Sequence, residues 1–198
     1  MTQTYGKNII GNGSRIFEPV FLGFPSIDLF GKTDYPGATI GDNAVLRTGT
    51  IIYSNVTIGN NFSTGHNVLI REHTTIGNNV AIGTSTVIEG TCVLRDNIRI
   101  QSMTFIPTHT TIGNGVFIGP NTIMTNDRYP PTGKPELKGP VVEDDVTIGA
   151  NVTILHGVRL GKGSAVAAGS IVTKNVPAGK LAIGSPARFV SMPTEMVR

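Results

Sequence analysis

Large apolar side chains recur at every sixth position along most of the chain. From Ile40 onward the series continues with Leu46, Ile52, Ile58, Thr64, Ile70, Ile76, Ile82, Ile88, Leu94, Ile100, Ile106, Ile112, Ile118 and Met124, and Thr64 is its one polar member. This spacing fits neither the turn of an α-helix, which takes about 3.6 residues, nor the alternation of a half-buried strand. It predicts short strands separated by sharp corners, so that the chain winds into a solenoid.

Two other positions of the repeat also have a fixed character. The residue four places after each large apolar one is mostly small or β-branched, which predicts a second inward position: Ala44, Thr50, Val56, Val68, Thr74, Val80, Thr86 and Cys92. The residue three places after it is mostly Asn, Gly, Asp or His, the types that tolerate a left-handed corner. Three repeats would close one triangular coil, with successive coils about 4.8 Å apart.

The same phase is present at Ile10, Ile16 and Leu22, and it resumes from Val142 to Val172. We therefore predict one all-β domain over residues 1–198, with the solenoid at about 10–177 and a C-terminal cap at 178–198. Loops are expected at 28–39 and 125–140, because the second stretch contains four prolines that a central strand would not accept.

The composition narrows the class of protein. With 25 glycines, no tryptophan and only 15% charged residues, the chain does not resemble a conventional helix-and-sheet domain. The net charge of +3 is spread thinly, which argues against nucleic acid as a partner but fits an anionic small molecule or a merely solvated surface. One cysteine, Cys92, excludes an internal disulfide, and no apolar run is long enough to predict a membrane partner. We expect a soluble, cytoplasmic protein.

The coil sequences Ile58-Gly59-Asn60-Asn61 and Ile76-Gly77-Asn78-Asn79 resemble the hexapeptide-repeat acyltransferase family, and the resemblance covers nearly the whole chain. It implies a left-handed parallel β-helix, against the usual right-handed crossover rule. It also implies a homotrimer with ligand grooves between neighbouring prisms, and a small-molecule acceptor.

The segment from Gly157 to Arg188 resembles the C-terminal signature of members that use acetyl-CoA, which implies acetyl-CoA as cosubstrate and no metal. In such members small residues at the places of Ala167, Ala168 and Gly169 let the pantetheine arm lie against the coil. The resemblance makes nearby basic residues candidates for the CoA phosphates: Lys162, Lys174, Lys180 and Arg188. Tight corners also need small residues without any ligand, so a purely structural reading stays open.

The run from Thr125 to Pro130, which reads Thr-Asn-Asp-Arg-Tyr-Pro, resembles a subgroup that N-acetylates amino sugars carried on UDP or dTDP. Better-known sugar acetyltransferases have a catalytic histidine at about this place, whereas this chain has Asn126 and Asp127. These two residues are our candidates for orienting an amine, which needs less help from a base than a hydroxyl. Arg128 and Tyr129 are candidates for binding the acceptor.

Counting coils places His73, Thr91, His109 and Asp127 along one corner. His109 would then lie one coil below Asp127, close enough for a hydrogen bond, which makes it a candidate base. The opposing interpretation is that histidine simply tolerates a left-handed corner. His66 and His73 are weaker candidates. His156, next to the segment that resembles the CoA signature, is open between a catalytic role and a surface role.

Three other functions remain open. A zinc carbonic anhydrase would need a further histidine five residues after His109, where Asn114 stands. A non-catalytic scaffold would explain the repeat alone, and it would bind no acetyl-CoA. An O-acetyltransferase of a sugar or antibiotic is the closest rival, and it would leave amine acceptors unreacted.

Overall fold

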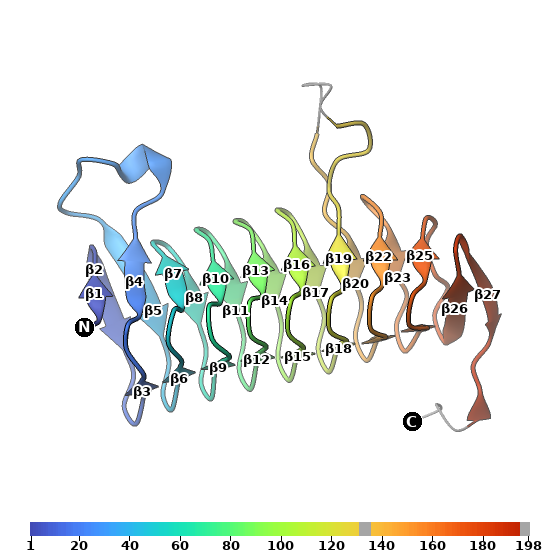
Figure 1. Ribbon diagram of the computed structural model, residues 1–198, viewed down its shortest axis with the longest axis horizontal. Helices are drawn as coiled ribbons and strands as arrows, with labels where there is room; N and C mark the ends of the chain where they lie inside the picture. Colours follow the sequence, from blue (N-terminus) through green and yellow to red (C-terminus); the bar gives the residue numbers. More distant parts are fainter. Residues whose placement is uncertain (131–135, 195–198) are drawn as a thin grey trace.

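The repeat folds as a parallel β-helix in the computed structural model, which describes residues 1–130 and 136–194. Three sheets form the faces of a long triangular prism, and each turn of the chain adds one strand to each face (Figure 1). The winding is left-handed, as the resemblance implied. We name the faces sheets A, B and C, and the corners AB, BC and CA after the faces they join. The predicted fold class is confirmed.

The strands are short and are stacked in sequence order on each face. Sheet A contains β1 (Gln3–Thr4), β4 (Phe21–Phe24), β7 (Ile51–Tyr53), β10 (Leu69–Ile70), β13 (Val87–Ile88), β16 (Phe105–Ile106), β19 (Ile123–Met124), β22 (Thr153–Ile154) and β25 (Ile171–Val172). Sheet B contains β2 (Lys7–Ile10), β5 (Pro36–Ile40), β8 (Thr57–Ile58), β11 (Thr75–Ile76), β14 (Val93–Leu94), β17 (Thr111–Ile112), β20 (Val141–Val142) and β23 (Arg159–Leu160).

Sheet C carries the end of the chain as well as its own series of strands. It contains β3 (Arg15–Ile16), β6 (Val45–Leu46), β9 (Ser63–Thr64), β12 (Ala81–Ile82), β15 (Arg99–Ile100), β18 (Phe117–Ile118), β21 (Thr147–Ile148), β24 (Ala165–Val166), β26 (Lys180–Gly184) and β27 (Ala187–Ser191). β26 pairs in parallel with β24, and β27 turns back on β26. This hairpin lies over the last coil, where we expected the cap; residues 195–198 of that expected segment lie outside the described residues.

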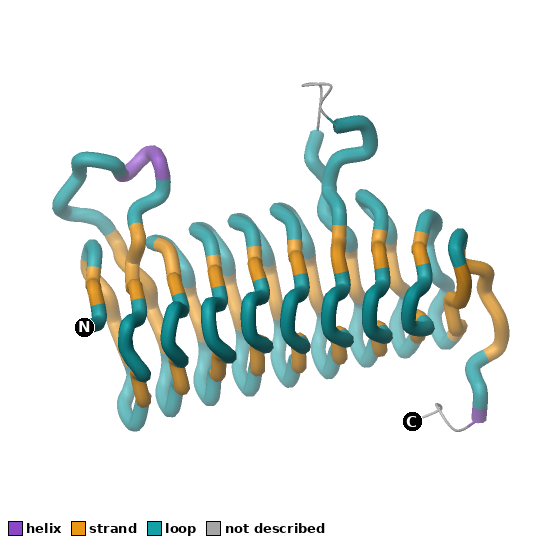
Figure 2. Tube along the Cα trace, viewed as in Figure 1, coloured by secondary structure: helices purple, strands orange, loops and turns teal. Residues whose placement is uncertain are grey.

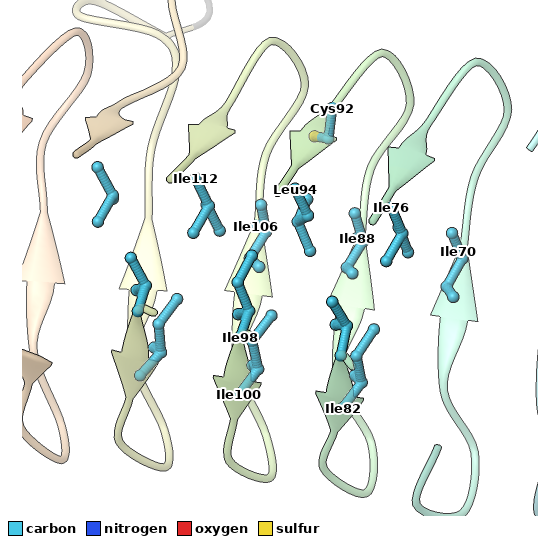
Figure 3. Close-up of a cluster of buried hydrophobic side chains, with 14 of the residues drawn as sticks. Ile70, Ile76, Ile82, Ile88, Cys92, Leu94, Ile98, Ile100, Ile106 and Ile112 are labelled. Atoms are coloured by element: carbon cyan, nitrogen blue, oxygen red, sulfur yellow. The ribbon is translucent and has the colours of Figure 1, made fainter. Parts of the chain in front are cut away.

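The six-residue series of apolar side chains fills the interior of the prism. Ile70, Ile88 and Ile106 are fully buried from sheet A, and isoleucines of the other sheets meet them (Figure 3). Cys92 occupies a second inward position, and its burial raises the pKa of the thiol to about 11. Burial of stacked aliphatic side chains supplies most of the favourable free energy of such a fold.

Asparagines at the corners show why the repeat selects them. Asn61 and Asn79 both have a φ of 57°, in the left-handed region, where asparagine is among the residues that tolerate it best. The side-chain amide of Asn61 donates to Asn79 at 2.9 Å, and Asn79 donates to Asn97 at 3.1 Å. Along corner BC, each of these turns is thereby joined to the next by a side-chain hydrogen bond.

The boundaries of the irregular segments differ from those we expected. Strand pairing begins before residue 10, because β1 and β2 already pair with β4 and β5. The first loop spans 25–35 and contains the 3-10 helix η1 (Ile27–Leu29), whereas the sequence predicted 28–39. The second loop leaves between β19 and β20 within the predicted 125–140, of which 131–135 lie outside the described residues. Both loops extend from the same edge of the prism (Figures 1 and 2).

No helix within residues 1–130 and 136–194 has the length and apolar character of a membrane span.

Candidate functional site

Asn126 lies at the base of the second loop, where the chain leaves the coil. Its side-chain amide donates to the carbonyl of Thr108, one coil earlier, at 3.4 Å. Its own carbonyl accepts the backbone N–H of Lys138 at 2.8 Å, which closes the loop where the chain returns. Asn126 thus anchors both ends of the loop to the solenoid.

Asp127 does not stack on His109, so that prediction is wrong. His109 takes the left-handed corner, with a φ of 66°, but the place above it belongs to Gly139, whose Cβ position would lie 2.5 Å from the carbonyl carbon of His109. The insertion leaves the coil before the corner is reached, so counting residues in phase misplaces Asp127. Instead, a carboxylate oxygen of Asp127 accepts the backbone N–H of Tyr129 at 2.8 Å.

Asp127 faces a hollow of about 290 Å³ at corner AB. Arg128, His156 and Lys174 line the same hollow. The guanidinium carbon of Arg128 lies 5.3 Å from the centre of the Tyr129 ring, a cation–π contact that holds these two exposed side chains together. Among the described residues, none of the cations forms an ion pair with Asp127, so its second carboxylate oxygen remains available to a ligand.

His156 reaches this hollow because consecutive coils present the same corner. It follows β22, directly after Leu155, and Lys174 holds the equivalent place after β25, one coil later. The backbone N–H of Leu155 donates to the carbonyl of Val172 at 3.0 Å, which keeps the two corners in register. The sequence left His156 open between a catalytic role and a surface role. The available signal was its spacing from Lys174, which equals one coil.

The residues predicted to bind acetyl-CoA lie on different corners of the chain. Ala167, Ala168 and Gly169 form corner CA after β24, and Lys174 belongs to corner AB. Lys162 lies at corner BC, in a separate hollow that Asp144 also lines. The structure therefore does not bring this set together within one chain.

Two smaller groups of that set do lie close in the fold. The carbonyl of Lys162 accepts the N–H of Gly179 at 3.0 Å, which puts Lys180 near the same corner. At corner CA, Arg188 pairs with Ile183 in the terminal hairpin, and the carbonyl of Ala182 accepts the N–H of Ala167 at 2.8 Å. Ala168 is exposed, so packing does not explain its small side chain.

The hollow at corner AB combines groups suited to acid–base chemistry and to anion binding. A carboxylate and an imidazole can hold an amine or hydroxyl and accept its proton, whereas the lysine and arginine can bind an anionic group. No three His, Cys, Asp or Glu side chains of the described part of the chain gather closely enough to hold a metal ion.

Comparison with known proteins points to one family. A family model described as the hexapeptide repeat of succinyl-transferase matches residues 141–174. A 2,3,4,5-tetrahydropyridine-2,6-dicarboxylate N-acetyltransferase of Staphylococcus aureus is 51% identical over 67 residues, which are 34% of this chain and 26% of that protein. The chain thus matches only about a quarter of the length of this curated relative.

Solved structures extend the likeness to the whole solenoid. A UDP-N-acetylglucosamine acyltransferase from Campylobacter jejuni superimposes with a TM-score of 0.78 over 97% of this chain and 74% of that one, at 20% identity. A hexapeptide-repeat acetyltransferase from Vibrio cholerae is 30% identical, covers 66% of this chain and 70% of its own, and has a TM-score of 0.41. The chain thus shares its six-residue repeat and its left-handed β-helix fold with the hexapeptide-repeat acyltransferases.

Proposed function

We propose that the protein is an acetyl-CoA-dependent N-acetyltransferase whose acceptor is an amino sugar linked to UDP or dTDP. The observation that carries this proposal is the hollow at the base of the second loop, where Asp127 and His156 meet two cationic side chains. The named relative that is 51% identical over 67 residues is also an N-acetyltransferase. The Thr125 to Pro130 motif supports an amino sugar as acceptor.

Acetyl-CoA supplies an activated acetyl group, and the residues of the chain position the acceptor amine. Asp127 holds the amine through its free carboxylate oxygen, because Tyr129 fixes the other one. His156 takes the proton that the amine loses as the carbon–nitrogen bond forms. The carbon–sulfur bond breaks in the same exchange, and the proton ends on the released thiol. Holding the amine close to the thioester is itself a large contribution to the rate.

The direct test mixes the protein with acetyl-CoA and a panel of UDP- and dTDP-linked 3-amino and 4-amino sugars, and follows release of free thiol. Release with one of these amines is the expected result, and it identifies the acceptor. The single cysteine of the protein should not contribute, because Cys92 is buried and its pKa is raised to about 11. Failure of every amine would contradict the N-acetyltransferase assignment.

His156 gives a specific reason to keep O-acetyl transfer to a sugar or antibiotic as the second candidate. A hydroxyl acceptor needs a base to remove its proton, and an imidazole in the hollow can serve as one. The matching hydroxyl sugars belong in the same panel. If they release thiol while the amines do not, the second candidate replaces the first. If acetyl-CoA does not bind at all, the scaffold interpretation is favoured.

We also propose that the chain works as a homotrimer that meets through sheet A. The outward row of this sheet is mostly apolar, with Gln3 and Thr153 as its polar members: Phe21, Ile51, Leu69, Val87, Phe105, Ile123 and Ile171. The outward rows of sheets B and C instead contain threonines and arginines, such as Thr57, Thr75 and Arg99. An apolar row of this length on one face only favours burial against other copies.

Because acetyl-CoA is its cosubstrate, we place the enzyme in the cytoplasm.

Leu69→Asp should convert the trimer to a monomer, since each copy would place a carboxylate in the apolar contact. Thr75→Asp, on the outward row of sheet B, is the matched control and should leave the trimer intact. Light scattering coupled to gel filtration measures both masses. A trimer that survives Leu69→Asp would show that sheet A does not form the contact.

A further inference from the structure

Thr64 is the polar exception in the apolar series, and it changes the hydrogen bonding of sheet C. In the neighbouring coils, the residue after each sheet C strand donates its N–H to the next coil's strand carbonyl, as Gly65 does to Ile82. Arg47 donates instead to the hydroxyl of Thr64, at 3.0 Å. The carbonyl of Thr64 is thereby free to accept the Arg47 guanidinium at 2.6 Å.

A second buried hydroxyl completes this arrangement. Thr50 donates to the backbone carbonyl of Arg47 at 2.6 Å and lies 3.0 Å from the hydroxyl of Thr64. Both threonines are buried, so their hydroxyls need these partners. Together they fix the backbone and the side chain of Arg47, although Arg47 itself lies at the surface. An arginine held in one orientation loses less conformational entropy when it binds a ligand.

Arg47 lies between two adjoining hollows along corner CA and sheet C. One, of about 360 Å³, is also lined by His66 and Arg99, over a floor that includes Gly65 and Gly83. The other, of about 390 Å³, is lined by Arg15, Phe17 and His66 as well as Arg47. Neither lining contains a carboxylate. Cations collected in a hollow without acidic neighbours are a site for an anion.

The guanidinium groups of these hollows are not neutralised by carboxylates, unlike those of two other arginines in the described chain. Arg71 pairs with Glu72 and Glu89, and Arg159 pairs with Glu143. Within residues 1–130 and 136–194, Arg15, Arg47 and Arg99 form no ion pair. A guanidinium offers a fork of donors that matches phosphate oxygens. An anion with several phosphate oxygens therefore suits this group of arginines.

Phe17 adds an aromatic surface beside the cations. Its side chain is 52% exposed, it follows β3 at corner CA, and it borders the hollow that contains Arg15 and Arg47. An exposed ring next to phosphate-binding groups is suited to stacking on a nucleobase. The two adjoining hollows together form the groove of our proposal. We propose that this groove binds a nucleoside diphosphate, with the base on Phe17 and the phosphates on Arg47, His66 and Arg99. Thr64 is the residue that positions Arg47.

This assignment deepens the proposed function and rests on it for one step, the identity of the bound nucleotide as the carrier of the acceptor sugar. Corner CA and the hollow at corner AB lie on opposite edges of sheet A. The groove is therefore a site separate from the hollow that contains Asp127. CoA also carries phosphates, so the test must distinguish the two sources.

Isothermal titration of the full-length protein with UDP, dTDP, inorganic pyrophosphate and CoA tests the proposal. Arg47→Gln and Arg99→Gln should each lower the affinity for UDP and dTDP about tenfold, because each removes a charged hydrogen-bond donor. Thr64→Val keeps the side-chain shape but removes the hydroxyl that accepts from Arg47, so it should also lower the affinity for UDP and dTDP. Phe17→Ala should lower the affinity for UDP and dTDP but not that for pyrophosphate, which has no base. Arg95→Gln, an exposed arginine at corner BC, is the matched control and should change nothing.

Two results would overturn the proposal. One is wild-type protein that binds neither UDP, dTDP nor pyrophosphate, or binds them equally well after Arg47→Gln and Arg99→Gln. The other is a loss of CoA affinity in these variants with nucleotide affinity unchanged, which would assign the groove to the cosubstrate. Because titration needs no turnover, these results are separate from the thiol-release assay that tests acetyl transfer. Circular dichroism of Thr64→Val checks that the coil still forms.

Discussion

Replacing His156 with alanine should lower kcat for acetyl transfer about a hundredfold, the usual contribution of a general base. The imidazole lines the hollow with Asp127, and in our proposal it takes the proton of the acceptor. His109→Ala is the matched control, because His109 lies at the same corner but lines no part of this hollow. That variant should keep most of its activity.

Asp127→Asn should act differently from His156→Ala. Asparagine can still accept the N–H of Tyr129 but carries no charge to hold an amine, so KM for the acceptor should rise together with a fall in kcat. Steady-state thiol release over a range of pH measures both parameters. Loss of the base should also remove the corresponding limb of the pH profile. If His156→Ala keeps the pH profile of the wild-type enzyme, the imidazole of His156 is not the base. If His109→Ala is inactive, His109 again becomes the candidate base.

The fold could be predicted from the sequence because a solenoid is a local structure repeated. Each coil meets only its neighbours, so the inward places of Ile70, Ile88 and Ile106 follow from spacing alone. The asparagine corners follow for the same reason, since one backbone conformation recurs with each repeat. Even Thr64 keeps its inward place, and only its effect on the hydrogen bonds of Arg47 is invisible in the sequence.

The candidate site could be predicted only in part, because an insertion breaks the relation between spacing and position. The phase of Val142 agrees with that of Met124, which placed Asp127 at the corner above His109. The phase of the six-residue repeat does not reveal where the loop leaves the coil. Gly139, on the returning side of the loop, occupies the corner above His109 instead of Asp127. His156 was undervalued for the same reason, since its neighbours across the insertion are distant in sequence but adjacent along corner AB.

The charge distribution shows a related limit of sequence analysis. Arg15, Arg47 and Arg99 are far apart along the chain and produce no cluster in the sequence, so the net charge looked evenly spread. The coil returns to sheet C with every turn and brings the three arginines to this face and to the adjoining corner CA. In a solenoid, charges should therefore be assigned to faces before their spacing along the sequence is judged.

Replacing Ile88 with alanine should lower the free energy of unfolding by about 3 kcal/mol, in the range measured when buried aliphatic side chains are truncated. Ile88 is fully buried in the central part of the prism, between Ile70 and Ile106 of the neighbouring coils (Figure 3). Backbone hydrogen bonds fix the spacing of these coils, so the core cannot collapse into the cavity that alanine leaves.

Thr75→Ala is the matched control for this change, because Thr75 lies outward on sheet B and is exposed. It should alter the free energy of unfolding by no more than about 0.5 kcal/mol. Urea denaturation at one protein concentration measures both variants, since assembly would otherwise contribute to stability. Equal costs for the two variants would mean that the coils do relax around the cavity. The column of isoleucines would then set the register of the winding more than its stability.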